Sequence, residues 1–196
     1  MSNFNNLGLN DKLTQTAQKI GFEHPTEVQS KVIPVLLEHS TTDLIALAQT
    51  GTGKTAAFGF PLLQKVDPEE KHTQGLILAP TRELCLQITK EMQSYAQMTG
   101  INNIVAIYGG ASIEQQAKSI RRGAQIVVAT PGRMKDMIKR NLVKIDQLEY
   151  CILDEADEML NMGFYEDITS ILSHTPDDKD TRLFSATMPK EVARIA

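Results

Sequence analysis

Short, continuously apolar runs separated by helix-length segments dominate this chain. The runs occupy residues 44–47, 76–78, 104–107, 126–128, 151–153 and 183–184. A run that is apolar throughout, rather than alternating with polar positions, is typical of a strand buried on both faces. Strands of this kind form parallel sheets that need a layer of helices on each side. The pattern therefore predicts an α/β fold with a mostly parallel β-sheet flanked by helices on both faces.

The segments outside these runs predict helices and polar connections. Residues 9–20 carry apolar side chains on one helical face, which favours a short amphipathic helix. A second helix is expected to begin near Pro25, with Thr26 as its N-cap. Residues 39–43 are predicted to form a polar link into the first strand. Residues 67–73 are predicted to form a polar, exposed connection.

The loop from Ala48 to Thr55 lies between the first apolar run and a helix-prone stretch. A strand, a glycine-bearing loop and a helix form the context of a phosphate-binding loop, whose backbone N–H groups surround phosphate oxygens. Lys54 would reach the β- and γ-phosphates, and Thr55 would place a hydroxyl on Mg²⁺. The usual pattern begins with glycine where this chain has Ala48, and a glycine-rich turn with a surface lysine is the alternative. The expected nucleotide contacts are Gln49, Thr50, Gly51, Thr52, Gly53, Lys54 and Thr55.

The composition is that of an ordinary soluble globular protein. The 196 residues are most simply one domain, with 41% hydrophobic and 22% charged residues. The chain has no apolar run of membrane-spanning length, and its first residues resemble no signal region. Cys85 and Cys151 lie in apolar contexts without metal-ligand spacing. We therefore expect reduced core cysteines in an intracellular, cytoplasmic protein.

The distribution of charge is uneven along the chain. The formal net charge of −4 does not favour nucleic-acid binding, but residues 130–144 contain five basic residues and one acidic residue. A basic stripe on an acidic protein can be the footprint of a phosphate backbone. The alternative is a solvated helix face.

Polar residues directly follow the apolar run at 151–153, and ligands of parallel sheets collect at the carboxyl ends of strands. Asp154 can hold Mg²⁺ directly or through water. Glu155 is placed to orient or deprotonate an attacking water. An acidic helix N-terminus is the alternative. We expect Asp154 and Glu155 to converge with Lys54 and Thr55, at neighbouring strand tips, on one magnesium-bound triphosphate, with Lys54, Asp154 and Glu155 as the catalytic residues.

The last apolar run is followed by Ser185-Ala186-Thr187. In an extended chain the two hydroxyls lie on the same side. They can bond Asp157 and so connect the nucleotide site to the rest of the molecule. Considered alone, this sequence is an ordinary strand end.

Taken in order, the motifs resemble the first RecA-like domain of a DEAD-box ATP-dependent RNA helicase, from Phe4 to the last residues. The resemblance implies a RecA-like P-loop NTPase fold, with ATP as substrate and Mg²⁺ as cofactor. The motifs are Gly21-Phe22, Pro25-Thr26-Glu27-Val28-Gln29, the phosphate loop, Pro80-Thr81-Arg82-Glu83-Leu84, Gly109-Gly110, Thr130-Pro131-Gly132-Arg133, Asp154-Glu155-Ala156-Asp157 and Ser185-Ala186-Thr187.

The resemblance also implies an adenine-binding motif. Gln29 would recognise adenine, because a glutamine amide offers the donor and acceptor that match N7 and the N6 amino group. Phe4, seventeen residues before Gly21, has the spacing of the aromatic residue that stacks on adenine in this family. Considered alone, Phe4 is a hydrophobic residue near a terminus. Phe22 and Thr26 belong to the same implied motif.

Other positions of the resemblance imply contacts with RNA and with a second domain. Glycines and helix N-termini let backbone N–H groups approach phosphates, and arginines add charge. Such contacts recognise backbone and sugar, so RNA binding would be independent of sequence. Individually, the glycine pair is more often a turn and the Thr130 motif a helix start. The implied RNA contacts are Pro80, Thr81, Arg82, Gly109, Gly110, Thr130, Gly132 and Arg133, and the implied interdomain coupling residues are Asp157, Ser185 and Thr187.

The sequence after Thr187 does not resemble the second RecA-like domain of that family, and residues 189–196 are predicted to form a helix without an end signal. We therefore expect the first domain of a longer, monomeric protein, whose arginine fingers lie in its second domain. The parent would bind RNA and hydrolyse ATP to unwind short duplexes or remodel RNA–protein complexes. The fragment would bind nucleotide and be nearly inactive.

Two other classes of function stay open. One is the core of a DNA helicase or translocase, because the residues themselves do not distinguish RNA from DNA. The other is a non-catalytic RNA clamp or scaffold. The presence of Lys54, Asp154 and Glu155 argues against a non-catalytic protein.

Overall fold

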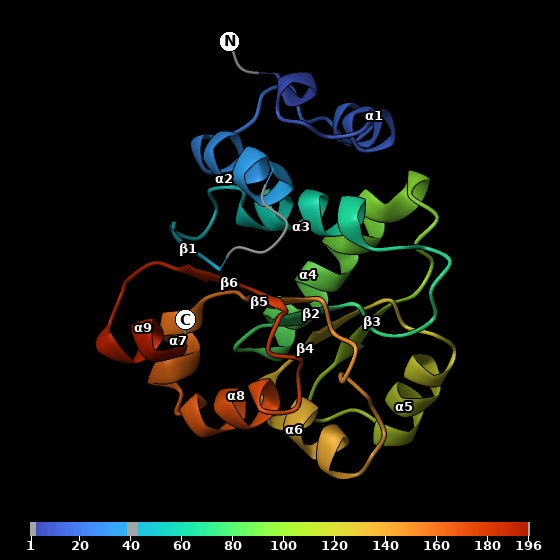
Figure 1. Cartoon of the computed structure of the whole chain (residues 1–196), viewed down its shortest axis with the longest axis vertical. Helices are drawn as coiled ribbons and strands as arrows, with labels where there is room; N and C mark the ends of the chain where they lie inside the picture. The colour runs from blue at the N-terminus through green and yellow to red at the C-terminus, as the bar shows by residue number, and fades with distance from the viewer. Residues whose placement is uncertain (1–2, 39–42, 196) are drawn as a thin grey trace.

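The computed structural model describes residues 3–38 and 43–195, and these form one parallel β-sheet between two layers of helices (Figure 1). The strands are β1 (Leu44–Leu47), β2 (Gly75–Leu78), β3 (Ile104–Ile107), β4 (Ile126–Ala129), β5 (Tyr150–Leu153) and β6 (Asp180–Ser185). The helices are α1 (Asp11–Lys19), α2 (Glu27–Glu38), α3 (Lys54–Lys65), α4 (Arg82–Tyr95), α5 (Ile113–Arg121), α6 (Pro131–Lys139), α7 (Ala156–Asn161), α8 (Tyr165–Leu172) and α9 (Lys190–Ile195), with 3₁₀ turns at Phe4–Asn6 and Ala96–Met98. Residues 39–42 of the predicted polar link lie outside the described residues.

The strand order is β1-β6-β5-β2-β4-β3, and every pair is parallel. The strands end level with one another: Leu78 at the end of β2 pairs with Leu153 of β5 and with Ala129 of β4. All carboxyl ends therefore lie at one edge of the sheet, where the following loops form a continuous rim. The predicted α/β class and parallel sheet are confirmed.

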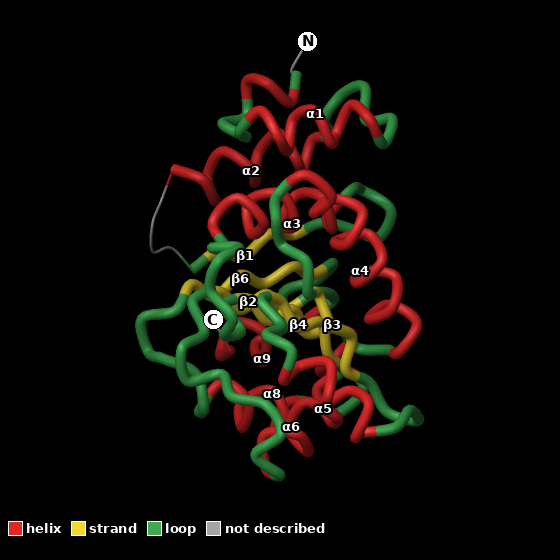
Figure 2. The backbone as a smooth tube through the Cα atoms, turned by 90° about the vertical axis from the view of Figure 1, so that its right-hand side faces the viewer, coloured by secondary structure: helices red, strands yellow, loops and turns green. Residues whose placement is uncertain are grey.

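Successive strand residues face two separate hydrophobic cores. Ile77 and Ile152 point to the core shared with α1–α4, whereas Leu78 and Leu153 point to the core shared with α5–α9. Figure 2 shows these two helix layers on opposite sides of the strands. Each strand must supply apolar side chains to both layers, which explains the continuously apolar runs. Each such side chain contributes about 1.5–3 kcal/mol by its burial.

Capping residues set the first two helices. α1 begins two residues later than expected, because the Asn10 side chain accepts a hydrogen bond from the Leu13 N–H at 3.0 Å and caps the helix there. α2 follows Thr26 as predicted. The Thr26 hydroxyl accepts from the Gln29 N–H at 3.4 Å, and the Gln29 Oε1 accepts from the Thr26 N–H at 3.0 Å. This reciprocal pair is a capping box.

Two local expectations differ from the structure. β1 is an edge strand, so Ile45 and Leu47 are 37% and 60% exposed. The apolar run at residues 44–47 is therefore not buried on both faces, contrary to what its sequence predicts. Thr73 is buried at the end of the predicted exposed connection, because its hydroxyl donates to the Ala124 carbonyl at 2.9 Å.

Both cysteines are free thiols in the core, as predicted. Burial raises the pKa of Cys85 and of Cys151 to about 12, so both stay protonated and unreactive at neutral pH. No helix in the described part of the chain is long and apolar enough to span a bilayer.

Candidate active site

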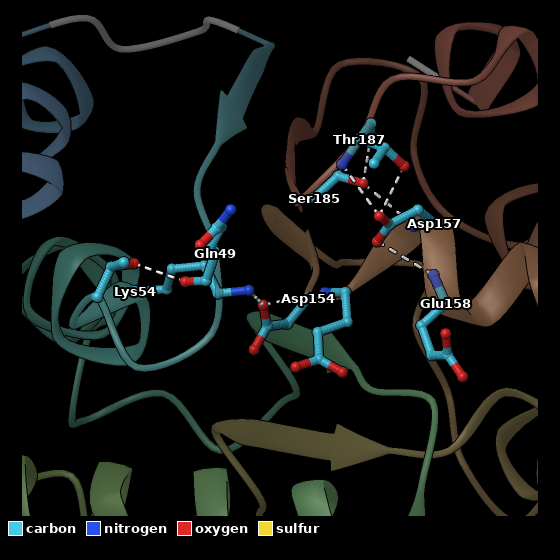
Figure 3. A network of polar contacts seen from close by, with 9 residues as sticks. Gln49, Lys54, Asp154, Asp157, Glu158, Ser185 and Thr187 are labelled. Atoms are coloured by element: carbon cyan, nitrogen blue, oxygen red, sulfur yellow. Dashed lines mark hydrogen bonds and ion pairs between the residues drawn. The ribbon is translucent and has the colours of Figure 1, made fainter.

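The glycine-bearing loop and the acidic strand end meet at the rim of the sheet. The Nζ of Lys54, the first residue of α3, lies 3.3 Å from Oδ1 of Asp154, which directly follows β5 (Figure 3). The two side chains are only 7% and 4% exposed. Lys54, Thr55, Asp154 and Glu155 border one cleft, as expected, and their common binding of a magnesium-bound triphosphate stays a prediction. The strand tips are not neighbours, because β6 lies between β1 and β5. Lys54 covers that separation because it begins the helix rather than ending the strand.

The loop itself holds a tight, glycine-dependent shape. Gly51 and Gly53 have φ angles of +77° and +86°, which side chains disfavour. The Thr52 hydroxyl closes the turn by donating to the Gln49 carbonyl at 2.7 Å. Ala48 is not at a positive φ, so the alanine in place of the usual glycine causes no backbone strain.

Gln29 rests directly on this loop. Its Nε2 donates to the Gly53 carbonyl at 3.1 Å, and the side chain is buried. A Cβ added to Gly53 would lie 2.5 Å from that Nε2, so the contact and the positive φ both require glycine here. The amide keeps one donor and one acceptor position beyond its bonds to Gly53 and Thr26.

A cleft of about 560 Å³ opens above Lys54 and Asp154, which is a size that suits a nucleotide. The predicted site residues that line it are Phe22, Gln29, Thr50, Gly51, Gly53, Lys54, Thr55, Asp154 and Glu155. The predicted residues Phe4, Thr26, Gln49 and Thr52 do not line it. A groove of similar volume, about 570 Å³, lies along α2 and β1, but its lining includes neither Lys54 nor the acidic pair.

Phe4 lies in the core rather than in the cleft. Its side chain is 1% exposed, and its ring stacks on Phe22 at a centroid distance of 6.0 Å and meets the edge of Phe60 at 6.2 Å. The described arrangement leaves no ring face for adenine and agrees with the alternative, a hydrophobic residue near a terminus. Phe22 and Tyr95 supply the aromatic side chains that line the cleft.

Helix α4 forms one wall of the cleft, which the sequence motifs did not predict. The wall consists of Leu84, Gln87, Glu91, Ser94 and Tyr95. These residues recur at helical spacing on one face, so the stripe itself was visible in the sequence. The packing of α4 against α3 decides what that stripe faces.

The two acidic residues differ in their surroundings. Burial raises the pKa of Asp154, and the ion pair with Lys54 partly offsets that rise. Partial burial and the nearby Asp154 charge raise the pKa of Glu155. A carboxylate whose pKa moves toward neutrality is a better general base. Asp154 is therefore the ion-pair partner of Lys54, and Glu155 beside it is the candidate general base.

Glu155 occupies a strained backbone position. Its φ and ψ angles are both +51°, a left-handed conformation that costs a non-glycine residue about 1–2 kcal/mol. The turn carries the chain from β5 into α7 and presents the Glu155 side chain to the cleft. Strain of this kind clusters at functional sites.

Asp157 joins the end of β6 to α7. Its Oδ2 accepts hydrogen bonds from the Thr187 N–H at 3.0 Å and the Thr187 hydroxyl at 2.8 Å. The Ser185 hydroxyl accepts from the Asp157 N–H at 3.2 Å and donates to the Thr187 carbonyl at 2.6 Å (Figure 3). The expected contacts between these three residues are present.

Replacing Thr187 with Val should lower the free energy of unfolding by about 1 kcal/mol at neutral pH, because it removes a donor to a carboxylate. Burial opposes the charge on Asp157, but bonds from Thr187 and Ser185 outweigh it and lower the pKa. A lowered pKa stabilises the fold above the pKa of an unfolded aspartate, and that stabilisation is lost as pH falls through the lowered value. Urea unfolding of both proteins from pH 7 to pH 3 should show the difference shrinking in acid.

Thr169→Val provides the matched control, because its hydroxyl donates to neutral carbonyls of α8. Its cost should not vary with pH. If the stability loss of Thr187→Val were also independent of pH, the assigned contact between Thr187 and a charged Asp157 would be contradicted.

The donor set of the site fits a nucleotide-bound Mg²⁺. Mg²⁺ keeps several waters and binds through one or two protein oxygens plus substrate phosphates. The Thr55 hydroxyl and the Asp154 carboxylate border the same cleft, which is sufficient for such an ion. Within residues 3–38 and 43–195, no group of three or more His, Cys, Asp or Glu side chains forms a metal site.

The residues implied to contact RNA lie along the other half of the rim, after β2, β4 and β3. Arg82 is exposed, and its guanidinium lies 5.0 Å from the ring centre of Tyr108. A Cβ on Gly110, which has a φ of +83°, would lie 3.6 Å from the Arg82 Nη1. The structure thus brings the Arg82 helix start and the Gly109-Gly110 turn together.

The remaining implied contacts have structural roles of their own. Thr81 caps α4 by accepting from the Leu84 N–H at 3.2 Å, and Pro80 is buried beneath it. Thr130 is the N-cap position of α6, and Gly132 is exposed in its first turn. Arg133 is half-buried and donates to the Ala111 carbonyl at 3.0 Å.

Two of the five basic residues in the stripe at residues 130–144 pair with carboxylates. Lys135 pairs with Asp167 at 2.7 Å, and Arg140 pairs with Asp136 at 2.8 Å. Arg133 is held by internal acceptors. The arrangement favours a solvated helix face over a phosphate footprint for the stripe as a whole.

Comparisons with known proteins show the family to which the chain belongs. The family model for the DEAD/DEAH box helicases matches residues 26–195. A protein of Limosilactobacillus reuteri named ATP-dependent RNA helicase CshA is 49% identical over 192 residues, which cover 98% of this chain and 38% of that protein. The RNA helicase CrhR of Synechocystis sp. is 48% identical and is covered over 39% of its length.

Solved structures show the same fold. A DEAD box protein from the hyperthermophile Methanococcus jannaschii has a TM-score of 0.94 at 44% identity, over 99% of this chain and 52% of that chain. Prp28 from Chaetomium thermophilum bound to ADP has a TM-score of 0.89 at 44% identity and is covered over 48%. This chain thus spans about half, or less, of the length of its relatives. It belongs to the DEAD/DEAH box helicase family and has the RecA-like fold of its structural relatives.

Proposed function

We propose that this chain is the ATP-binding first domain of a longer ATP-dependent RNA helicase. The observation that carries the proposal is the contact of 3.3 Å between Lys54 and Asp154 at the floor of a nucleotide-sized cleft, with Glu155 beside it. A buried cation, a buried carboxylate and a basic carboxylate converge there, which is the arrangement that phosphoryl transfer to water needs.

Each residue has a role in this proposal. Lys54 would exchange its bond to Asp154 for the β- and γ-phosphates, with backbone N–H groups of the loop around them. Glu155 would orient and deprotonate the attacking water. Thr55 and Asp154 would hold Mg²⁺, whose charge would neutralise phosphate oxygens. The free donor and acceptor of Gln29 would recognise adenine, and its bond to Gly53 would link that recognition to the phosphate loop.

The other half of the rim would hold RNA. The relatives CshA and CrhR are named RNA helicases, and a Saccharomyces cerevisiae Dbp5 variant with a TM-score of 0.88 was solved bound to RNA and ADP BeF3. Arg82, the Gly109-Gly110 turn and the start of α6 present a charge and backbone N–H groups rather than a base-specific surface. RNA would therefore be bound through its backbone, without sequence preference.

The second RecA-like domain of the parent would complete the catalytic site. RNA binding would close the two domains of a monomeric, cytoplasmic protein and bring an arginine finger to the phosphates. Asp157, Ser185 and Thr187 would transmit that closure, because they connect the acidic motif to the end of β6. The parent would use ATP to unwind short duplexes or remodel RNA–protein complexes.

The proposal predicts that the isolated 196-residue chain takes up ATP analogues but hydrolyses ATP slowly, even with saturating RNA. The missing arginine finger should lower turnover by about 10³-fold or more relative to the parent. Calorimetry and a phosphate-release assay measure the two quantities.

Robust RNA-stimulated turnover by the chain alone would overturn the two-domain mechanism. Absence of nucleotide uptake by folded chain would overturn the nucleotide site. Competition of DNA against RNA for the ATP-bound parent tests the nucleic-acid class.

A further inference from the structure

A buried glutamine lies between two of the loops that form the proposed RNA-binding rim. Gln116, on α5, is 7% exposed. Its Nε2 donates to the Tyr108 carbonyl at 3.0 Å, and its Oε1 accepts from Nη1 of Arg133 at 3.2 Å. Both ends of one amide are therefore used, one on the loop after β3 and one on the first turn of α6.

The two bonds fix segments that follow adjacent strands. Tyr108 directly precedes the Gly109-Gly110 turn after β3, and Arg133 lies in the first turn of α6 after β4. The Nη1 of Arg133 also donates a hydrogen bond to the carbonyl of Ala111, just beyond the glycine turn, at 3.0 Å. Gln116 and Arg133 thus hold the backbone on both sides of that turn.

A third loop is connected through an aromatic ring. The Tyr108 ring, whose backbone Gln116 holds, lies 5.0 Å from the guanidinium of Arg82 at the start of α4. A cation over an aromatic face is attracted to it, so the ring constrains where the Arg82 charge lies. The chain of contacts from Arg133 through Gln116 and Tyr108 to Arg82 joins the start of α6, the loop after β3 and the start of α4.

The bonds also restrict how Arg133 can meet a ligand. A guanidinium has five N–H donors, and the two on Nη1 are occupied by Gln116 and Ala111. The Nε and Nη2 donors remain for another acceptor, and that pair matches two phosphate oxygens. Holding a group in its binding geometry beforehand lowers the entropy lost on binding.

We propose that Gln116 is a positioning residue for RNA, which sets the relative arrangement of the loop after β3 and the starts of α4 and α6 without touching RNA itself. The inference rests on the proposed function, because it assigns Gln116 to the proposed RNA-binding rim. Replacing the amide of Gln116 should weaken RNA binding. It should leave nucleotide binding unchanged, because Gln116 does not line the nucleotide cleft.

The test replaces Gln116 with Met, which has similar length and no hydrogen bond, in the parent protein with a non-hydrolysable ATP analogue. Gln115→Met is the matched control, because Gln115 is the exposed neighbour on the same helix. Anisotropy of a labelled single-stranded RNA should show Kd raised about tenfold for Gln116→Met and unchanged for Gln115→Met. The slope of log Kd against log salt should fall in magnitude by about 0.7, as for one lost phosphate contact. A fluorescent ATP analogue should bind both variants like the unmodified protein.

Arg133→Ala and the double variant complete the cycle. If Gln116 acts through Arg133, the double variant should bind RNA no more weakly than Arg133→Ala alone. Gln116→Glu, which keeps an acceptor for Arg133 but loses the donor to Tyr108, provides a second variant should the methionine protein fail to fold. It should also weaken RNA binding while nucleotide affinity stays unchanged.

Three results would overturn the inference. The first is equal RNA affinity of Gln116→Met, or of folded Gln116→Glu, and the unmodified protein. The second is full additivity with Arg133→Ala. The third is an unmodified protein that binds ATP but no RNA. That result would overturn the proposed RNA function together with this inference, whereas the first two results would overturn only the role assigned to Gln116.

Discussion

Replacing Glu155 with Gln in the parent protein is expected to lower RNA-stimulated ATP turnover by about 10²–10⁴-fold, the usual contribution of a general base. The amide keeps the size of the side chain but cannot accept the proton of the attacking water. Lys54, Thr55 and the loop backbone are unchanged, so the affinity for ATP should be maintained. Steady-state phosphate release and equilibrium binding of a fluorescent ATP analogue separate the two effects.

Glu158→Gln is the matched control for this substitution. Glu158 is an exposed residue of the same helix, α7, and does not line the cleft. Its replacement should leave turnover unchanged. If Glu155→Gln also left turnover unchanged, Glu155 would not be the catalytic base and the assigned chemistry would be wrong.

Replacing Lys54 with Met should weaken nucleotide binding and also destabilise the fold. The affinity for ATP should fall on the order of 10- to 100-fold, because a charged hydrogen bond to phosphate is lost. Asp154, which is 3% exposed, would be left as an unpaired buried carboxylate, and breaking a buried pair in this way costs about 3–5 kcal/mol. Calorimetry and urea unfolding measure the two losses.

The stability loss of Lys54→Met should depend on pH in a defined direction. Burial already raises the pKa of Asp154, and removal of Lys54 would raise it further. An acid with a raised pKa destabilises the fold as pH rises from its unfolded pKa to its folded pKa. The cost should therefore shrink in mild acid, where Asp154 is neutral. The double variant Lys54→Met with Asp154→Asn should recover most of the stability at pH 7.

Lys31→Met is the control for loss of a lysine, because Lys31 forms a surface pair with Glu27 and is 73% exposed. Its effect on stability should stay within about 0.5 kcal/mol. A Lys54→Met protein as stable as this control at pH 7 would show that the Lys54–Asp154 contact does not exist in solution.

The local parts of the fold could be predicted because they depend on neighbouring residues. The six apolar runs became six strands, since a strand that feeds two cores must be apolar on both faces. The contact between Lys54 and Asp154 joins distant segments, but it could be predicted because the carboxyl ends of parallel strands share one edge. Gly51 and Gly53 satisfy a backbone requirement that the loop sequence already contains.

The parts that could not be predicted depend on packing between distant segments. Phe4 is in the core because residues near the N-terminus fold against Phe22 and Phe60, and spacing alone does not reveal that contact. The wall of α4 and the contacts of Gln116 could not be predicted for the same reason. An amide on an amphipathic helix has no distinguishing pattern until its two partners are known.

By itself the sequence determined which segments are strands and helices, and which chemical groups stand at the strand ends, because both follow from short-range periodicity and backbone geometry. The tertiary structure alone decided the order β1-β6-β5-β2-β4-β3, which inserts β6 between the phosphate loop and the acidic motif. It also decided the burial of Phe4 and the connection from Arg133 through Gln116 to Tyr108. These depend on long-range contacts, whose partners are set only when the two helix layers close on the sheet.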